Sequence, residues 1–275
     1  MVKINILLEN HSIDKKYFSS HGLSVLMEFN EKLILLDVGP NNDYLKNANK
    51  KNIDLSKVNY LFLSHNHNDH TGGINSFLKL NSSAAVYLMD NILNKYYINM
   101  LFFKSPISLK IKKKYIPRIT QVKEDLNIEN KIFFLKNESS KYRKPTFNSE
   151  LFKKEESKYI NDTFDHEGIF VLEDNNELLV FNSCSHNGIL NSIETVKAKL
   201  PNKKIKAYLG GLHLSNPVTK DNESDEYLDY LAKELKGMET AIYTGHCTGE
   251  YSLNYLKNGL GDKVKEINTG MELSF

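Results

Sequence analysis

The sequence predicts a mixed α/β fold in which two β-sheets pack together and helices cover their outer faces. Short runs rich in Ile, Val, Leu and Phe alternate with stretches of helical apolar spacing. This alternation occurs twice, before residue 89 and again after residue 161, and strands that precede alternating strands and helices are typical of such a layered fold. A chain of 275 residues with 40% hydrophobic residues can bury the core that this fold requires.

The elements follow from the pattern in chain order. In the first half, strand-type runs bounded by polar or glycine-containing turns occupy 2–8, 23–29, 33–37, 59–63 and 84–88, and helical spacing covers 44–51 and 73–80. In the second half, a hairpin turn at 173–176 joins strands at 168–172 and 177–181. The remaining elements are helices at 190–200, 223–236 and 251–257 and strands at 205–209, 240–244, 264–267 and 271–275.

The middle of the chain differs in charge. Residues 89–160 hold 16 Lys and Arg against 8 Asp and Glu, a net charge of +8, whereas the remainder has 20 against 26, a net of −6. We interpret 89–160 as a basic, aromatic-rich insertion in a single domain of residues 1–275, where it forms a lid or a pocket wall. Its field would attract an anionic small-molecule substrate. Two alternatives are a small subdomain packed by its own aromatics and a solvated surface.

Composition limits the other classes of function. No apolar run approaches the ~20 residues that span a bilayer, and the N-terminus alternates like a strand and has no small-residue cleavage site. Two cysteines do not make a disulfide framework. We therefore expect a cytoplasmic protein with no membrane partner and no nucleic-acid partner, and the oligomeric state stays open.

The densest candidate site is the stretch from Ser64 to Gly73, SHNHNDHTGG, directly after the apolar run 60–63. It holds four side chains that can bind a metal, and imidazole and carboxylate are the usual protein ligands of zinc and similar ions. His65 and His67 can point at one ion, and Asp69 and His70 at a second. The alternative is a polar loop that happens to be rich in histidine.

Other chemically capable side chains also follow predicted strands. They are Asp37, Cys184, His186, His213 and His246. Because strand ends on one edge of a sheet converge, residues distant in sequence can surround one point. His213 follows two glycines, which permit close backbone approach to a ligand, and its imidazole can polarise a substrate oxygen or donate a proton as a catalytic residue.

These motifs resemble a known family. HxHxDH followed by Thr-Gly-Gly is similar to the second motif of the metallo-β-lactamase superfamily, and Leu35 to Gly39 (LLDVG) to its first. The blocks at 45–56, 183–189, 209–214 and 245–249 resemble a subgroup of predicted metal-dependent hydrolases that includes archaeal dihydropterin-ribofuranosylaminobenzene-phosphate synthases. The resemblance covers residues 1 to about 88 and about 162 to 275, and it implies a four-layer αββα sandwich.

The resemblance also implies a ligand set for one or two zinc ions, with iron or manganese as alternatives. Site one takes His65, His67 and a later histidine, for which we favour His186 over His166. Site two takes Asp69, His70 and His246.

Two further positions follow from the same resemblance. Cys184 stands where the family has a bridging Asp, and it is either a substitute ligand or a small buried residue. Asp37 orients a ligating histidine and raises its basicity.

We therefore expect a metal-dependent hydrolase. A bound metal ion supplies hydroxide at neutral pH for attack on an ester, lactone or phosphoester, and Asp69 holds the nucleophile as a catalytic residue. The first alternative is a pterin-linked transferase of the dihydropterin-ribofuranosylaminobenzene-phosphate synthase kind. The second is a non-catalytic protein that binds metal for stability or sensing.

Overall fold

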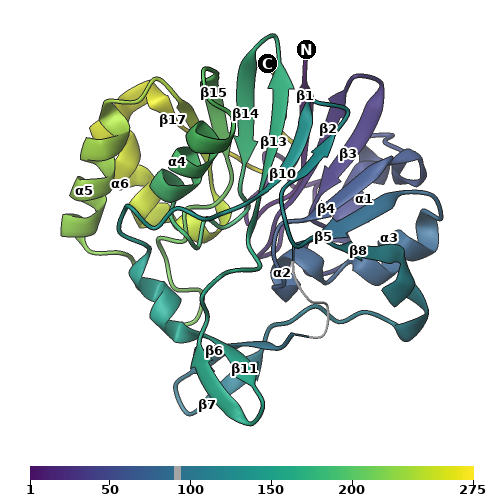
Figure 1. Cartoon of the computed structure of the whole chain (residues 1–275), viewed down its shortest axis with the longest axis horizontal. Helices are drawn as coiled ribbons and strands as arrows, with labels where there is room; N and C mark the ends of the chain where they lie inside the picture. Colours follow the sequence, from purple (N-terminus) through teal and green to yellow (C-terminus); the bar gives the residue numbers. More distant parts are fainter. Residues whose placement is uncertain (90–93) are drawn as a thin grey trace. The chain divides into compact units, whose positions relative to one another are not determined.

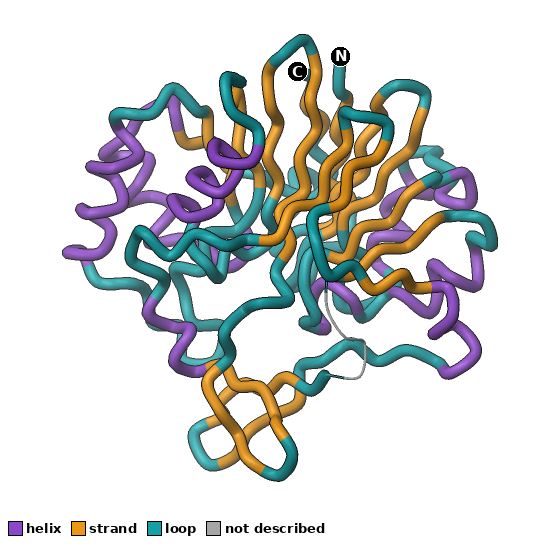
Figure 2. Tube along the Cα trace, viewed as in Figure 1, coloured by secondary structure: helices purple, strands orange, loops and turns teal. Residues whose placement is uncertain are grey.

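The computed structural model describes residues 1–89 and 94–275, which divide into two compact units. Unit 1 consists of Met1–Tyr97, Pro106–Glu124 and Ile267–Phe275, and unit 2 of Ile98–Ser105 and Asp125–Glu266. Each unit has its own seven-stranded sheet and its own helices (Figures 1 and 2). In the described part of the chain, no helix is both long enough and apolar enough to cross a bilayer.

The sheet of unit 1 has the strand order β18-β1-β2-β3-β4-β5-β8. Its strands are β1 (Lys3–Leu8), β2 (Ser24–Phe29), β3 (Lys32–Leu36), β4 (Tyr60–Leu63), β5 (Ala85–Leu88), β8 (Ile119–Gln121) and β18 (Glu272–Ser274). The helices are α1 (Asp43–Lys50), α2 (Asn68–Thr71) and α3 (Ile74–Leu80), with short 3₁₀ helices at Leu55–Lys57 and Lys113–Arg118. Tyr44 of α1 and Phe77 of α3 belong to one buried cluster with Leu35 and Leu61 of the sheet.

The sheet of unit 2 has the order β17-β16-β15-β14-β13-β10-β9. Its strands are β9 (Leu126–Ile128), β10 (Ile132–Lys136), β13 (Gly168–Asp174), β14 (Glu177–Phe181), β15 (Lys204–Leu209), β16 (Ala241–Thr244) and β17 (Val264–Glu266). The helices are α4 (Ile189–Lys199), α5 (Asp225–Lys236) and α6 (Glu250–Leu260), with 3₁₀ helices at Thr146–Glu150, His246–Thr248 and Gly261–Lys263. Val196, Leu231 and Leu256 from the three α-helices pack in one cluster with Val171 and Val180 of the sheet.

The segment predicted as an insertion contributes to all three sheets that the described residues form. It supplies β8 to unit 1 and β9 and β10 to unit 2. It also forms a four-stranded sheet of order β12-β11-β6-β7, from β6 (Tyr96–Met100), β7 (Phe103–Pro106), β11 (Leu151–Glu155) and β12 (Lys158–Asn161). Residues 90–93 of the segment lie outside the described residues, and its role as a lid or pocket wall stays a prediction.

Two element boundaries differ from the sequence pattern for identifiable reasons. The strand expected to reach residue 37 ends at Leu36, because Asp37 has the left-handed backbone angle φ +60°. The helix expected from residue 223 begins at Asp225, because Ser224 caps it by accepting a hydrogen bond from the Tyr227 N–H. Both differences fall where a polar residue ends a regular element.

Gly210, directly after β15, is expected to be irreplaceable in this fold. It has φ +145°, and an added Cβ would lie 1.8 Å from the Asn182 carbonyl oxygen. We expect Gly210→Ala to lower the free energy of unfolding by about 3 kcal/mol or more, measured by urea denaturation. The control is Gly259→Ala in α6, where the nearest atom to an added Cβ is 3.8 Å away, and we expect it to be neutral or to stabilise by up to about 1 kcal/mol. Equal stability of the two variants would contradict this account of the turn.

Candidate functional site

Three of the predicted metal ligands are neighbours in unit 1, in the loop after β4 and in α2. His65 and His70 are fully buried and His67 is 4% exposed. The ring centroid of His65 lies 4.6 Å from that of His67 and 4.4 Å from that of His70. Three imidazoles of this loop therefore share one buried environment.

A buried carboxylate, Asp37, connects two of these histidines. Its Oδ1 accepts a hydrogen bond from the Ser64 N–H at 2.7 Å, and its Oδ2 accepts bonds from the Ser64 hydroxyl at 2.7 Å and from His70 Nδ1 at 2.8 Å. The Ser64 oxygen lies 2.8 Å from His65 Nδ1. Because the serine gives its one proton to Asp37, it accepts the proton of His65 Nδ1.

This network determines which nitrogen each ring can offer to a metal. The Nδ1 atoms of His65 and His70 are both engaged by oxygen atoms, so Nε2 is the atom left to act as a ligand. Imidazole rings held through Nδ1 in this way are typical of metal-binding histidines, and the buried donor set fits a zinc-like ion. The structure places Asp37 where the sequence expected an orienting carboxylate, and its functional role remains a prediction.

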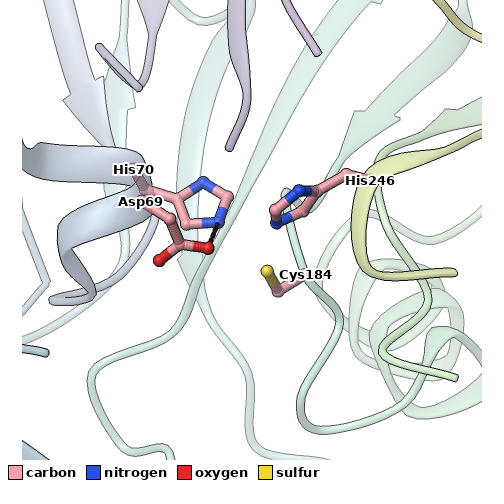
Figure 3. Close-up of side chains that lie close together, drawn as sticks. All are labelled: Asp69, His70, Cys184 and His246. Carbon is pink, nitrogen blue, oxygen red and sulfur yellow. Dashed lines mark ion pairs between the residues drawn. The ribbon is translucent and has the colours of Figure 1, made fainter. Parts of the chain in front are cut away.

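Asp69 lies on the other side of His70. Its Oδ2 is 3.2 Å from His70 Nε2 (Figure 3) and 3.7 Å from His21 Nε2. Burial alone would lower the pKa of His70, but the negative charges of Asp69 and Asp37 raise it to about 10. Without a metal, His70 therefore carries a proton between two carboxylates, and metal binding must displace that proton.

Spacing and residue type did not select His21, Ser64 or Asn66 as site residues. Ser64 and Asn66 adjoin the histidines, but ligand spacing alone does not select hydroxyl and amide side chains. Asn66 Oδ1 accepts a hydrogen bond from the Leu109 N–H at 2.9 Å, and Asn68 N–H donates to the Ile107 carbonyl at 2.6 Å. The segment 107–109 therefore runs alongside the histidine loop.

His186 in unit 2 is held by several groups at once. Its N–H donates to Glu167 at 2.6 Å, and its ring stacks on Phe164 at 4.4 Å between centroids. The Asn148 Nδ2 donates a hydrogen bond to the His186 carbonyl oxygen at 2.7 Å, and the Asn148 Oδ1 lies 3.3 Å from the His186 Nδ1. Glu167 and Asn148 are positioning residues that no spacing rule in the sequence indicated.

His166, the alternative to His186, is a buried residue of unit 2. It is 2% exposed, and its Nε2 lies 2.9 Å from Asp162 Oδ2. A buried histidine next to a carboxylate can serve a metal or hold the local fold, so its assignment as a ligand stays a prediction.

Cys184 and His246 approach each other within unit 2. Their ligand atoms lie within 4.8 Å of each other, and so do those of Cys184 and His186. Figure 3 shows the Cys184 thiol and the His246 ring side by side. Burial opposes ionisation of the neighbouring Cys247, but its contact with Cys184 and the charge of His246 lower its pKa well below the ordinary value.

His213 lies against His186, with 4.2 Å between ring centroids, and is 5% exposed. Among the described residues, neither of its ring nitrogens has a hydrogen-bond partner. The two glycines before it approach protein atoms, because a Cβ on Gly211 would lie 2.4 Å from Cys247 Sγ. These glycines therefore allow close packing within the chain, and their close approach to a ligand stays a prediction.

Four residues of these two loop sets have left-handed backbone angles. They are Asp37 (φ 60°), Ser185 (φ 56°), His213 (φ 52°) and His246 (φ 53°). Non-glycine residues in this region are strained, and such strain concentrates at functional sites. Unit 1 thus groups His65, His67, Asp69 and His70, with Asp37 bonded to His70. Unit 2 groups His186, His213, Cys184 and His246. The ligand and catalytic roles of these residues stay predictions.

Comparisons with known proteins agree with this fold. The sequence profile of the metallo-beta-lactamase superfamily matches residues 20–93. The crystal structure of a metal-dependent hydrolase of the beta-lactamase superfamily superposes with a TM-score of 0.83 at 25% identity, covering 100% of this chain and 99% of that chain.

Two proteins of Methanocaldococcus jannaschii are similar over nearly their whole lengths. One is an uncharacterized protein, 28% identical over 92% of this chain and 93% of its own. The other is a 7,8-dihydropterin-6-methyl-4-(beta-D-ribofuranosyl)-aminobenzene-5'-phosphate synthase, 27% identical over 100% of this chain and 97% of its own. The chain is thus similar to the metallo-β-lactamase superfamily in sequence over residues 20–93 and shares its fold with a solved hydrolase of that superfamily over the whole chain.

The Asp37–His70 pair predicts how the stability of the metal-free protein changes with pH. The folded-state pKa of His70, about 10, exceeds its ordinary value of 6.5. The stabilisation is therefore fully present below pH 6.5 and is lost as the pH rises through about 10. We expect the free energy of unfolding, measured in urea with a chelator present, to fall across this window.

Asp37→Asn tests the source of this effect. We expect it to cost about 3 kcal/mol at pH 6 and to weaken the pH dependence, because it removes one of the two carboxylates beside His70 and leaves Asp69, the larger cause of its raised pKa. Asp54→Asn, at an exposed carboxylate bonded to Ser56, is the control and should keep the wild-type profile. Parallel curves for Asp37→Asn and wild type would show that Asp37 does not set the charge of His70.

Proposed function

We propose that this protein is a metal-dependent hydrolase that cleaves an ester, lactone or phosphoester. The observation that carries the proposal is the group of three buried imidazoles in unit 1, two of which are held through Nδ1 by the Ser64–Asp37 network. The similarity of residues 20–93 to the metallo-β-lactamase superfamily and the fold shared with a solved metal-dependent hydrolase support it.

The proposed ligands are His65, His67, Asp69 and His70 from unit 1 and His186 and His246 from unit 2. Cys184 and His166 are the weaker candidates. The proposed metal is zinc, as one or two ions, with iron or manganese as alternatives because imidazole and carboxylate suit all three.

The bound metal would lower the pKa of water to near 7 and so supply hydroxide at neutral pH. The side chain of Asp69 is 21% exposed, unlike that of His70, so it can hold the nucleophile and take up its proton. His213, whose ring nitrogens have no hydrogen-bond partner among the described residues, can donate a proton to the leaving group.

A pterin-linked transferase is the second candidate. It is favoured by the 27% identity to the dihydropterin-ribofuranosylaminobenzene-phosphate synthase over the full chain. An aminobenzene-type substrate, assayed beside esters, lactones and phosphodiesters, separates this candidate from a hydrolase.

Variants of the histidines test the proposal through metal content and activity together. We expect His67→Ala to lower both, because it removes a ligand. His213→Ala should lower hydrolysis about 100-fold while sparing metal, because general acid catalysis contributes on this order. The measurements are elemental analysis of protein purified without added metal and initial rates on the substrate panel. The control is His11→Ala, an exposed histidine of unit 1.

The same experiment separates the alternatives. Reduced metal content in His186→Ala and His246→Ala supports ligands from unit 2. Full metal occupancy in His67→Ala would refute the ligand assignment. Turnover of the aminobenzene substrate alone would indicate the transferase, and loss of folding on metal removal with no turnover at all would indicate a non-catalytic metal-binding protein.

A further inference from the structure

A groove of about 460 Å³ lies in unit 1, within the size range of small-molecule sites. It combines two kinds of side chain. Three are lysines, Lys95, Lys110 and Lys112, and three are apolar, Leu109, Ile111 and Ile116. The lysines are exposed, whereas Leu109 is 4% exposed and belongs to the hydrophobic cluster of unit 1.

The groove is rich in positive charge. Residues 91–123 contain eight Lys and Arg and no Asp or Glu. In the ranges 1–89 and 94–275, no carboxylate pairs with any of the three lysines of the groove. Other lysines of the chain do have acidic partners, such as Lys46 with Asp43 and Lys141 with Glu194. The groove therefore presents a local positive potential.

The segment that carries two of these lysines is fixed in place. Asn75 of α3, which also lines the groove, donates from Nδ2 to the Lys110 carbonyl at 2.7 Å. Its Oδ1 accepts a hydrogen bond from the Lys112 N–H at 2.8 Å. One side chain thus holds the backbone at both lysines, so the charges are anchored although their stems remain flexible.

The same segment is joined to the histidine loop. The Leu109 N–H donates to Asn66, which lies between His65 and His67 in sequence. Ser108 forms an isolated antiparallel bridge with His67. The segment that lines the groove is therefore hydrogen-bonded to the histidine loop within unit 1.

We propose that this groove binds a small molecule that carries one phosphate or carboxylate group on an apolar body. The lysine ammonium groups would hold the anion, and Leu109, Ile111 and Ile116 would contact the body. If the proposed function holds, this molecule is the substrate. A groove of this size with three lysines takes one anionic group, whereas a nucleic acid requires a longer track of phosphate contacts.

The experiment uses naphthylmethylphosphonate, whose carbon–phosphorus bond is not hydrolysed, titrated into the full-length protein as purified by calorimetry. Lys110→Gln with Lys112→Gln should weaken binding about tenfold or more, as expected for charged hydrogen bonds. Lys113→Gln is the matched control, because Lys113 is exposed in the same segment but does not line the groove, and it should change affinity less than twofold. Inorganic phosphate and naphthylmethanol, each half of the probe, should both bind more weakly than the phosphonate.

Four other outcomes would contradict the proposal that this groove binds the ligand. If Lys113→Gln weakened binding as much as the double lysine variant, the ligand would be attracted by the general positive charge of the segment and not by the groove. If inorganic phosphate bound as tightly as the phosphonate, the apolar residues would not contribute to binding. If naphthylmethanol bound as tightly as the phosphonate, the lysines would not contribute. Loss of binding in His67→Ala with normal binding in the lysine variant would move the ligand to the metal. Because the probe is not hydrolysed, its binding is tested separately from catalysis. If the protein binds the probe at the lysines but hydrolyses no substrate, the proposed function is refuted and the proposed binding groove is supported.

Discussion

The arrangement of unit 1 depends on one buried carboxylate. Asp37 is fully buried and accepts three hydrogen bonds, two from Ser64 and one from His70. An ionised carboxylate inside a protein is costly unless it is hydrogen-bonded and paired, so these contacts must form together. They determine where β3 ends and how the loop after β4 begins. They also determine which nitrogen of His65 and His70 is left to bind a metal. The negative charges of Asp69 and Asp37 together raise the pKa of His70.

His186 in unit 2 is held by a comparable device built from different residues. Glu167 binds its backbone N–H, Phe164 stacks on its ring, and Asn148 approaches Nδ1. In both units an oxygen atom lies at Nδ1 of a candidate ligand, a feature that orients metal-binding imidazoles. Buried polar contacts thus orient these imidazole rings. The left-handed backbone angles of His213 and His246 are consistent with the same constraint.

Much of this fold could be predicted because its signals are local. Apolar runs, helical spacing and strand-end motifs located β3, β4 and α4 to within a residue or two, and HxHxDH identified the histidine loop. The segment 89–160 was harder, because β8 and β9 have only three residues each and owe their existence to neighbouring strands. Ser64, Asn148 and Glu167 were missed for the same reason: their importance arises from contacts that form only in the folded chain.

The account centres on a metal ion bound chiefly by imidazole nitrogen. X-ray absorption spectroscopy of the metal in protein purified without added metal tests this most directly. We expect nitrogen and oxygen neighbours at about 2.0–2.1 Å, with the outer-shell scattering of at least two imidazole rings and at most one sulfur at about 2.3 Å. A metal surrounded mainly by sulfur, or one without imidazole scattering, would contradict it.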